Sequence, residues 1–463
     1  MIPLLMASVA HAFCGFYVGG AGAEMYNDAT VVVMMRDGSR TVLSMQNSYE
    51  GPARDFALVV PVPEVLDEED VRTLPREVFA RVDQLAAPRL VEYWERDPCQ
   101  PYLYEEMSRA MPVKMSRKGG APPPMAAQDL GVTIEAEFAV AEYDIVILSA
   151  KDSSGLDTWL RQEKYNIPAG AESVLRGYVQ QGTKFFVAKV DPKRVTFEGD
   201  RAVLSPLRIA YDDERFSLPV RLGLLNAKGE QDLLVHILAK EQRYEVANYP
   251  NVTVPTNLVV SEKVADNFPG FYDAVLGHTF RRNPKAVVTE YAWQAGSCDP
   301  CPGPTLTGDD VATLGADLIG PPAPMIWTLT RLHARYTAQT LEEDLVFRKA
   351  EPLIGGRGTP SAEGKLQEAT QPSSINQFQG RYAILHRWEG AMKCEQPQRG
   401  LWGGPPNSNS DKPVAKAAEG RLELAAPAPV RDLAALLVDD LPGLKARPAG
   451  SPASNGLIPE LTE

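Results

Sequence analysis

Residues 30–45, TVVVMMRDGSRTVLSM, predict the β-hairpin from which the fold can be worked out. Two apolar runs, residues 30–35 and 41–45, flank the segment Arg36-Asp-Gly-Ser39. Runs of apolar and β-branched residues favour strands, and Asp-Gly between two such runs is a strong short-range hairpin signal. We therefore expect antiparallel β structure near the start of the chain.

Periodicity over the following residues predicts a mixture of strands and helices. Strands are expected over residues 55–63, 132–138, 143–148, 183–190, 204–210, 218–225, 232–238, 286–293, 326–336 and 381–386. Helices are expected over residues 68–97 with an interruption at Pro88, and over residues 155–161, 171–181 and 264–280. This mixture predicts an α+β fold with mainly antiparallel sheets and packed helices. The strand–helix–strand order over residues 143–190 favours a sheet that helices cover on one face.

Composition divides the chain into three parts. Residues 1–12 are expected to be the remainder of a signal peptide, and residues 13–402 a globular α+β region, with two subdomains that meet near residue 192. Residues 403–463 are rich in Ala, Pro and Gly, so they bury too little apolar surface to offset the entropy of ordering. We expect this tail to be disordered apart from one short helix over residues 429–440.

The first residues indicate export. Residues 2–10 are apolar, and Ala10-His-Ala12 is a small-x-small cleavage pattern. The apolar run is far shorter than the about 20 residues that span a bilayer. We interpret it as the end of an export signal that starts upstream of Met1 and is cleaved after Ala12. The alternative is a buried N-terminal strand or helix.

Charge and hydropathy disfavour nucleic acid and a membrane interior as binding partners. The 463 residues carry a formal net charge of −13, and basic runs are short. Nucleic-acid binding needs a basic surface, which this composition does not favour. No later segment is long and apolar enough to predict a membrane span. We therefore expect a soluble protein without a nucleic-acid or membrane-spanning role.

The pair Cys298-Asp-Pro-Cys301 allows three kinds of chemistry: a redox dithiol, half of a metal site, or a covalent staple. A reactive dithiol needs a helix N-terminus or a cationic neighbour, which lowers the pKa of its thiol. Pro302-Gly-Pro304 prevents a helix from starting directly after Cys301, and the next helix is expected near Thr307. The dithiol is thus predicted to lie on a loop, which disfavours redox chemistry.

Metal and cofactor binding are not expected. A zinc site needs four ligands, and a second cysteine pair is missing. Histidines His236, His278, His333 and His386 are scattered singly. His236 and His333 lie in alternating strands, where a hydrogen-bonded core or surface histidine is the usual outcome. Motifs of serine hydrolases, zinc proteases and phosphate-binding loops are absent, so no catalytic residue is predicted.

Disulfides remain the favoured interpretation of the cysteines, because they suit an exported chain. The candidates are Cys14, Cys99, Cys298, Cys301 and Cys394. Their odd number leaves one cysteine free or paired between molecules. We expect at least one intrachain bridge: a short Cys298–Cys301 ring, or a link from either of these to Cys394 or Cys14.

Eight stretches together resemble a bacterial family of predicted secreted proteins, domain of unknown function 2330. They are FCGFYV (13–18), DFALVVPVP (55–63), APRLVEY (87–93), YDIVILSA (143–150), GLDTWL (155–160), FFVAKV (185–190), LPVRLG (218–223) and CDPC (298–301). The likeness covers residues 13–405. It implies export and brings no activity with it.

Three functions follow as hypotheses. The favoured one is a secreted, periplasmic or cell-envelope protein without enzymatic activity, which binds an unknown protein or envelope component or has a structural role. The second is an envelope enzyme of unknown class, and the third is a thiol-disulfide redox helper that uses Cys298 and Cys301. A broad apolar surface favours the first hypothesis, and a pocket with convergent carboxylates or histidines favours the second.

Overall fold

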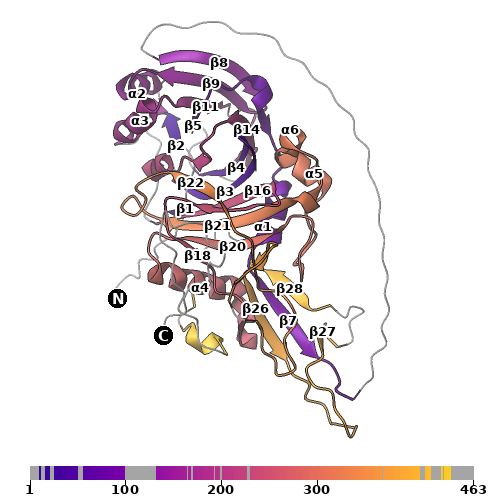
Figure 1. The fold of residues 1–463 in the computed structure, drawn as a ribbon. Coiled ribbons are helices and arrows are strands. Elements are labelled where there is room, and N and C mark those ends of the chain that lie inside the picture. The colour runs from indigo at the N-terminus through magenta and orange to yellow at the C-terminus, as the bar shows by residue number, and fades with distance from the viewer. Residues whose placement is uncertain are drawn as a thin grey trace, which may run out of the picture.

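The computed structural model describes residues 10–11, 16–20, 26–50, 56–99, 132–163, 165–167, 170–191, 193–198, 201–226, 230–367, 369–406, 412–418, 429–430 and 432–438. Cys14, most of the expected signal remainder and much of the expected tail lie outside these residues. Figure 1 shows three tiers: a sheet with two helices at the top, a large sheet in the middle, and a helix with a second small sheet at the bottom.

The predicted hairpin is present at the centre of the large sheet. Strands β3 (Tyr26–Asp37) and β4 (Arg40–Glu50) pair in antiparallel register, and Gly38-Ser39 forms the two-residue loop. Gly38 has a φ of +57°, and Ser39 does not share this left-handed conformation. A positive φ at the first loop residue alone is the pattern of a type II′ turn, which glycine favours.

The apolar run in β3 is continuous because both faces of the strand are buried. Val32 and Met34 face a core shared with the upper sheet, whereas Val31 and Val33 face a core shared with helix α1 (Glu77–Ala86). Alternate residues of a strand point to opposite faces. A strand that is covered on both faces therefore has apolar residues at successive positions.

The middle of the large sheet has the order β4-β3-β16-β21-β20. Strands β16 (Gln231–Lys240), β20 (Val287–Gln294) and β21 (Trp327–Tyr336) confirm the strands predicted over residues 232–238, 286–293 and 326–336. β16 runs parallel to β3, and β21 pairs antiparallel with both β16 and β20. Ala10–His11 (β1) pairs in parallel with β16. The other strands of the large sheet are β6 (Val71–Thr73), β12 (Thr196–Glu198), β13 (Arg201–Val203), β14 (Leu207–Asp212), β18 (Asn251–Thr253), β23 (Leu353–Gly355), β24 (Gln371–Pro372) and β25 (Gln377–Gln379).

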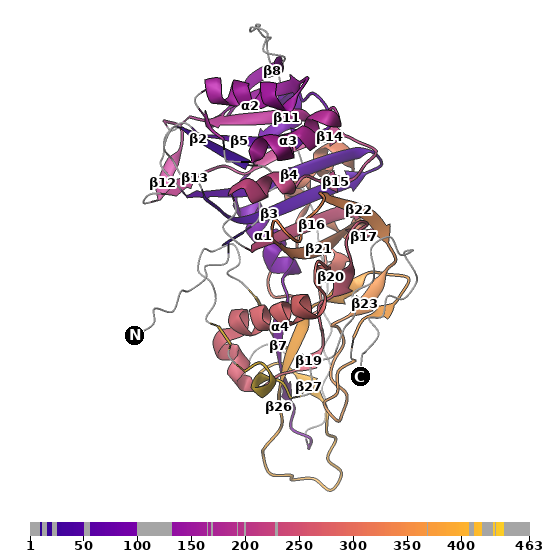
Figure 2. The same ribbon diagram turned by 90° about the vertical axis from the view of Figure 1, so that its left-hand side faces the viewer.

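The upper sheet confirms the expectation of helices on one face (Figure 2). Its strand order is β10-β2-β5-β11-β9-β8, and helices α2 (Ser153–Gln162) and α3 (Ala171–Gln180) pack on it through a separate core. Asp152 caps α2 by accepting a hydrogen bond from the Gly155 backbone N–H at 2.7 Å. The strands are β2 (Phe16–Gly20), β5 (Phe56–Val62), β8 (Val132–Val140), β9 (Tyr143–Ala150), β10 (Tyr165–Asn166) and β11 (Lys184–Val190).

Two predicted elements were wrong in extent or type. The helix expected over residues 68–97 is only α1, because residues 68–70 form a 3-10 turn and residues after Pro88 form strand β7 (Arg89–Glu95). The strand expected over residues 218–225 is instead β15 (Ser217–Leu218) followed by the 3-10 helix η2 (Arg221–Asn226). Pro219 and Gly223 both weaken a strand in this stretch. β15 pairs with β22 (Leu345–Ala350), which also pairs with β17 (Arg243–Val246).

The lower tier joins distant parts of the chain. Helix α4 (Phe268–Arg282), which follows the 3-10 helix η3 (Glu262–Asn267), packs between β20 and the lower sheet. Strand β7 pairs with β26 (Arg381–His386) on one side and with β27 (Trp402–Gly403) and β28 (Val414–Ala417) on the other. β26 also pairs with β19 (Leu258–Val259).

Part of the expected tail belongs to this lower tier. Strand β28 joins the sheet, and the short 3-10 helix η6 (Ala434–Leu436) falls within the stretch where one helix was expected. Two subdomains meeting near residue 192 remain a prediction, since β3 and β4 share a sheet with β16, β20 and β21. No helix among the described residues has the length and apolar character needed to cross a membrane.

Candidate functional site

The four described cysteines form two disulfides. Cys99 is bonded to Cys394, with a Cα–Cα distance of 5.4 Å across a sequence separation of 295 residues. Cys298 is bonded to Cys301, with a Cα–Cα distance of 5.0 Å. The short ring was one of the pairings considered from the sequence. The Cys99–Cys394 pairing was not, because nothing local in the sequence brings these residues together.

The Cys298–Cys301 ring lies on a loop, as its prolines predicted. The loop begins after β20, and the next helix, α5 (Gly308–Val311), is capped by the Thr307 hydroxyl. After α5 the chain passes through a π-helical turn (Ala312–Ala316), α6 (Asp317–Ile319) and the 3-10 helix η5 (Pro324–Ile326) before it enters β21. Cys301 is exposed, whereas Cys298 packs partly against the core below α1.

A cationic neighbour of this loop comes from a distant part of the chain. The fully buried guanidinium of Arg89 donates a hydrogen bond from Nη1 to the Pro300 carbonyl at 2.9 Å. Its Nη2 donates to the carbonyls of Leu85 and Ala87 at 2.6 and 3.3 Å. Arg89 opens β7, more than 200 residues before the loop, so no sequence spacing indicates this contact.

Two further buried side chains hold the same region. Gln379 donates hydrogen bonds from Nε2 to the carbonyls of Asp299 and Gly356, both at 2.7 Å. Arg381, fully buried at the start of β26, donates to the Asn257 side chain and to the Tyr93 hydroxyl, both at 2.7 Å. The junction between the large and the lower sheet is thus built around guanidinium and amide groups.

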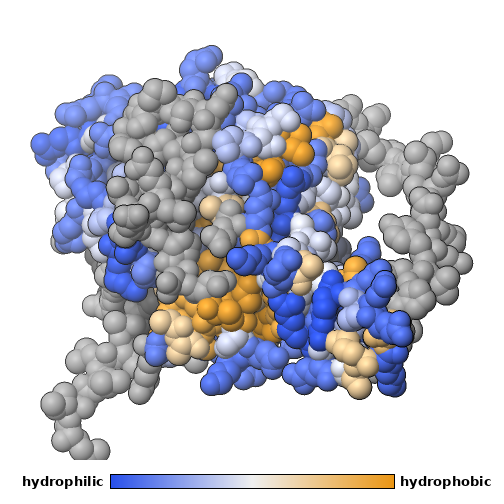
Figure 3. All heavy atoms as spheres, turned by 60° about the horizontal axis from the view of Figure 1, so that its bottom comes forward, coloured by the Kyte–Doolittle hydropathy of each residue, from blue (hydrophilic) through white to orange (hydrophobic). Residues whose placement is uncertain are grey.

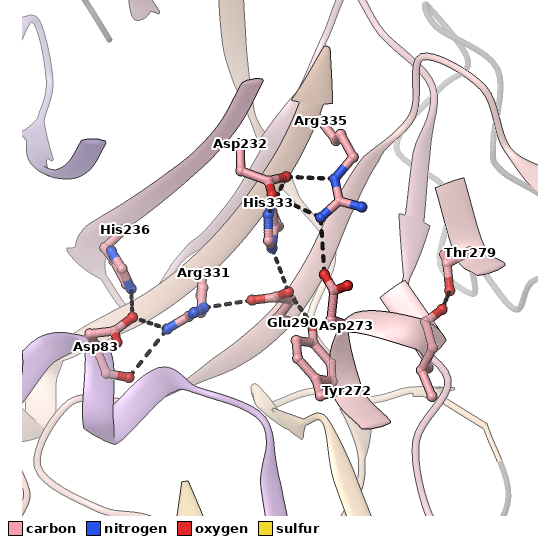
Figure 4. A network of polar contacts seen from close by, with 11 residues as sticks. Asp83, Asp232, His236, Tyr272, Asp273, Thr279, Glu290, Arg331, His333 and Arg335 are labelled. Atoms are coloured by element: carbon pink, nitrogen blue, oxygen red, sulfur yellow. Dashed lines mark hydrogen bonds and ion pairs between the residues drawn. The ribbon is translucent and has the colours of Figure 1, made fainter. Parts of the chain in front are cut away.

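A larger polar network crosses the interior beside β21 (Figure 4). Arg331, His333 and Arg335 occupy alternate positions of this strand, so their side chains share one face of it. The side chains of Arg331 and His333 are 1% and 0% exposed, and that of Arg335 is 11% exposed. The network therefore runs from a fully buried end toward the surface.

A β-bulge places Glu290 in the middle of this network. Thr289 of β20 pairs with Leu332 and Tyr291 pairs with Arg331, so Glu290 is the extra residue between them. Bulges re-aim side chains, and here the Glu290 carboxylate reaches Arg331 Nε at 2.5 Å and His333 Nδ1 at 2.8 Å. The Tyr272 hydroxyl of α4 also donates to Glu290.

Arg331 links this carboxylate to α1. Its Nη1 donates to both the carboxylate and the backbone carbonyl of Asp83. Burial by itself lowers the pKa of Arg331, but the carboxylates of Asp83 and Glu290 outweigh burial and raise the pKa above its ordinary value. Arg331 therefore stays charged with two counter-ions, which is the arrangement that makes a buried guanidinium tolerable.

His333 bridges two carboxylates. Its Nδ1 lies 2.8 Å from Glu290 Oε1, and its Nε2 lies 3.0 Å from Asp232 Oδ1. The two ring nitrogens of His333 therefore join Glu290 of β20 to Asp232 of β16.

Asp232 connects the network to its outer end. Burial would raise the pKa of its carboxyl group, but His333 and Arg335 outweigh burial and hold that pKa well below its ordinary range. Arg335 contacts Asp232 through Nε and Nη2, both at 2.8 Å, and Asp273 of α4 at 3.2 Å. Asp273 is 41% exposed, so the last ion pair lies at the surface.

The remaining histidines behave individually. His236 is fully buried, 4.0 Å from Asp83, and burial and the charge of Arg331 lower its pKa well below its ordinary value. Burial and the charges of Arg281 and Arg282 lower the pKa of His278. His386 lies between Glu92 and Glu262 and stacks on Trp94, with ring centroids 4.5 Å apart.

The described residues contain no group of three or more His, Cys, Asp or Glu side chains arranged to hold a metal ion. The charged network gathers carboxylates and a histidine, the residue types that an active site uses, but its central side chains are sealed from solvent. In this structure the network has a structural role, because its ion pairs join α1, β16, β20, β21 and α4. Solvent reaches this region at the outer end of the network, at Asp273, and at the loop of Cys298 and Cys301.

Comparison with known families gives one match. A family described as an uncharacterised protein conserved in bacteria, domain of unknown function 2330, matches residues 8–348. The chain belongs to this family. The domain-of-unknown-function 2330 match confirms the resemblance seen in the sequence, but it ends before the C-terminal strands of the lower sheet, whereas the likeness was expected to extend to residue 405. Neither a curated protein nor a solved structure matches the chain.

Proposed function

We propose that this protein works outside the cytosol, in the cell envelope or the extracellular space, as a binding or structural protein. The observation that carries the location is the pair of disulfides, Cys99–Cys394 and Cys298–Cys301. Disulfides persist in oxidising compartments and are rare in the cytosol, where glutathione and thioredoxin reduce them. The small-x-small pattern at residues 10–12 is typical of an export signal, but Ala10 and His11 also pair with β16 as strand β1, so the location rests on the disulfides.

A hydrophobic surface supports the binding role. On the face turned forward in Figure 3, hydrophobic residues gather into one area with hydrophilic residues beside it. Contiguous apolar areas of this kind mark interaction sites, whereas single apolar side chains on a surface are ordinary. The lower tier also has partly exposed apolar side chains packed against its core, at Val430, Leu433, Leu436 and Leu437, and Val438 is 63% exposed.

The location is tested on protein from the native bacterium. Free thiols are alkylated at lysis, the cytosol, envelope and medium are separated, and peptides are mapped with and without reductant. We expect the protein in the envelope or the medium, with a peptide that links Cys99 to Cys394. Cytosolic protein that retains residues 1–12 and has five alkylated cysteines would contradict the proposal.

A further inference from the structure

Arg89 is a buried cation without a carboxylate partner among the described residues. Its side chain is fully buried, its two Nη atoms bond only carbonyl oxygens, and its Nε has no hydrogen bond. Burial, together with the nearby charges of Arg381 and Arg331, lowers the pKa of Arg89 to about 10. Burying a charge without a counter-ion is costly, so its position calls for an explanation.

This cation is held against the cysteine loop. The Pro300 carbonyl that accepts from Arg89 belongs to the peptide group joining Pro300 to Cys301. Gln379 holds the preceding carbonyl, that of Asp299, from the opposite strand β25. Both central carbonyls of the loop are therefore fixed by buried side chains, while Cys301 itself is exposed.

The other charged or titratable groups near the loop are few. Arg381 adds a second buried cation, and the phenols of Tyr93 and Tyr291 lie beside the two arginines. Asp299 is the acidic group that acts on Arg381 and Tyr93, and it is exposed. Because Asp299 is exposed, water screens its carboxylate better than it screens the buried guanidinium of Arg89.

We propose that Cys298 and Cys301 form a thiol–disulfide exchange site, in which Arg89 stabilises the thiolate form and the reacting partner is a dithiol of an exported protein or peptide. Cations lower the pKa of nearby thiols and so favour the thiolate that exchange chemistry needs. This activity is additional to the binding or structural role proposed above. Arg89 is a positioning residue here, because it acts on the loop and not on the partner.

A partner thiolate attacks the exposed sulfur of Cys301, the Cys298–Cys301 bond breaks, and the electron pair leaves with Cys298 as a thiolate. The second partner thiolate attacks the partner sulfur of the mixed disulfide and releases Cys301 as a thiolate. The partner dithiol is oxidised to a disulfide, the protein disulfide is reduced to two thiols, and the two protons of the partner are transferred to solvent or to the released thiolates.

The first test measures thiolate formation in the reduced full-length protein. Iodoacetamide alkylation is followed for each cysteine by mass spectrometry between pH 4 and pH 10. We expect Cys298 or Cys301 to have an apparent pKa at least one unit below the about 8.5 of a free thiol. Cys99 and Cys394 in the same sample serve as internal controls. If both Cys298 and Cys301 have pKa values at or above about 8.5, the proposal is wrong.

Variants assign the effect to Arg89. We expect Arg89→Met to raise the low thiol pKa by about one unit, which slows alkylation at pH 7 nearly tenfold. Arg81→Met is the matched control, because Arg81 lies on α1 and pairs with Asp310 rather than with the loop. An unchanged alkylation profile in Arg89→Met would show that Arg89 does not stabilise the thiolate. If Arg89→Met does not fold, the wild-type alkylation profile and the rate of exchange with a dithiol peptide decide whether Cys298 and Cys301 form an exchange site.

The second test measures exchange itself. The oxidised protein is mixed with a synthetic peptide that contains two reduced cysteines, and formation of the peptide disulfide is followed at pH 7. We expect oxidation at least ten times faster than with Cys298→Ser/Cys301→Ser, which keeps the Cys99–Cys394 bond. Equal rates would overturn the exchange site, while the cell-fractionation result for the proposed location would stand unaffected.

Discussion

Arg331 is the residue on which the interior network most depends, because it bonds Asp83 of α1 and Glu290 of β20 together. Replacing it with Met leaves both carboxylates buried without this counter-charge. We expect Arg331→Met to lower the free energy of unfolding by about 3–5 kcal/mol, measured by urea denaturation. Arg161→Met, which removes an exposed helix ion pair with Asp157, should change it by less than about 0.5 kcal/mol. Similar losses in the two variants would contradict this role of Arg331.

The ionisation of Asp232 makes the free energy of unfolding depend on pH in the acidic range. Its pKa is lower in the folded state than in the unfolded state, so its contribution is fully present at pH well above the unfolded value of about 3.9 and is lost as pH falls through the folded pKa. We expect Asp232→Asn to be less stable at pH 7 and to lose less of its remaining stability between pH 5 and pH 3. Urea titrations across this range measure the slope.

The matched control for Asp232 is Asp37→Asn, because Asp37 is 46% exposed and pairs with Lys240 at the surface. We expect this variant to follow the wild-type dependence on pH. An Asp232→Asn variant with the same acid slope as wild type would show that this carboxylate does not contribute to the pH dependence.

At the scale of elements, the β3–β4 hairpin depends on the backbone conformation of Gly38. No atom lies within 4 Å of the position that a Cβ would take there, so a side chain meets no steric obstacle. Its φ of +57° is nevertheless unfavourable for an L-residue. We expect Gly38→Ala to cost about 1 kcal/mol in thermal unfolding. Equal stability of Gly38→Ala and wild type would contradict the turn assignment.

Elements with regular periodicity were predictable from the sequence, and their long-range partners were not. Alternation along residues 326–336 predicted β21, and so placed Arg331, His333 and Arg335 on one face. Their partners come from α1, β16, β20 and α4, at sequence separations between 41 and 248 residues, for which no local pattern exists. The bulge at Glu290 also has no sequence signal, because it arises from the pairing of β20 with β21.

The same limit explains the errors near α1 and in the cysteine loop. Apolar spacing over residues 68–97 resembles one long helix, yet residues 89–95 pair with β26 nearly 300 residues later. The contact of Arg89 with Pro300 depends on that pairing. The sequence alone therefore could not predict that Arg89 lies beside the cysteine loop.

At the scale of the whole molecule, the Cys99–Cys394 bond joins the part matched by the family to the part beyond it. All three strands that pair with β7 lie after residue 348, where the match ends. A bond across 295 residues restricts the unfolded chain more than one across 3 residues. We expect Cys99→Ser/Cys394→Ser to cost about 5 kcal/mol in urea unfolding and Cys298→Ser/Cys301→Ser about 2 kcal/mol. The reverse order would contradict this assignment.

The C-terminal residues complete the lower tier and should add to its stability. Strand β28 extends the sheet beside β7, and the backbone at Ser261 and Val438 bonds the carbonyls of Leu436 and Val259, both at 3.0 Å. A chain that ends at residue 411 loses these bonds and uncovers apolar surface below α4, which we expect to cost on the order of 3 kcal/mol. A chain that ends at residue 438 keeps every described contact and is the matched control. Thermal unfolding compares the two with the full chain, and a 411-residue variant as stable as the control would show that β28 and η6 contribute nothing to the fold.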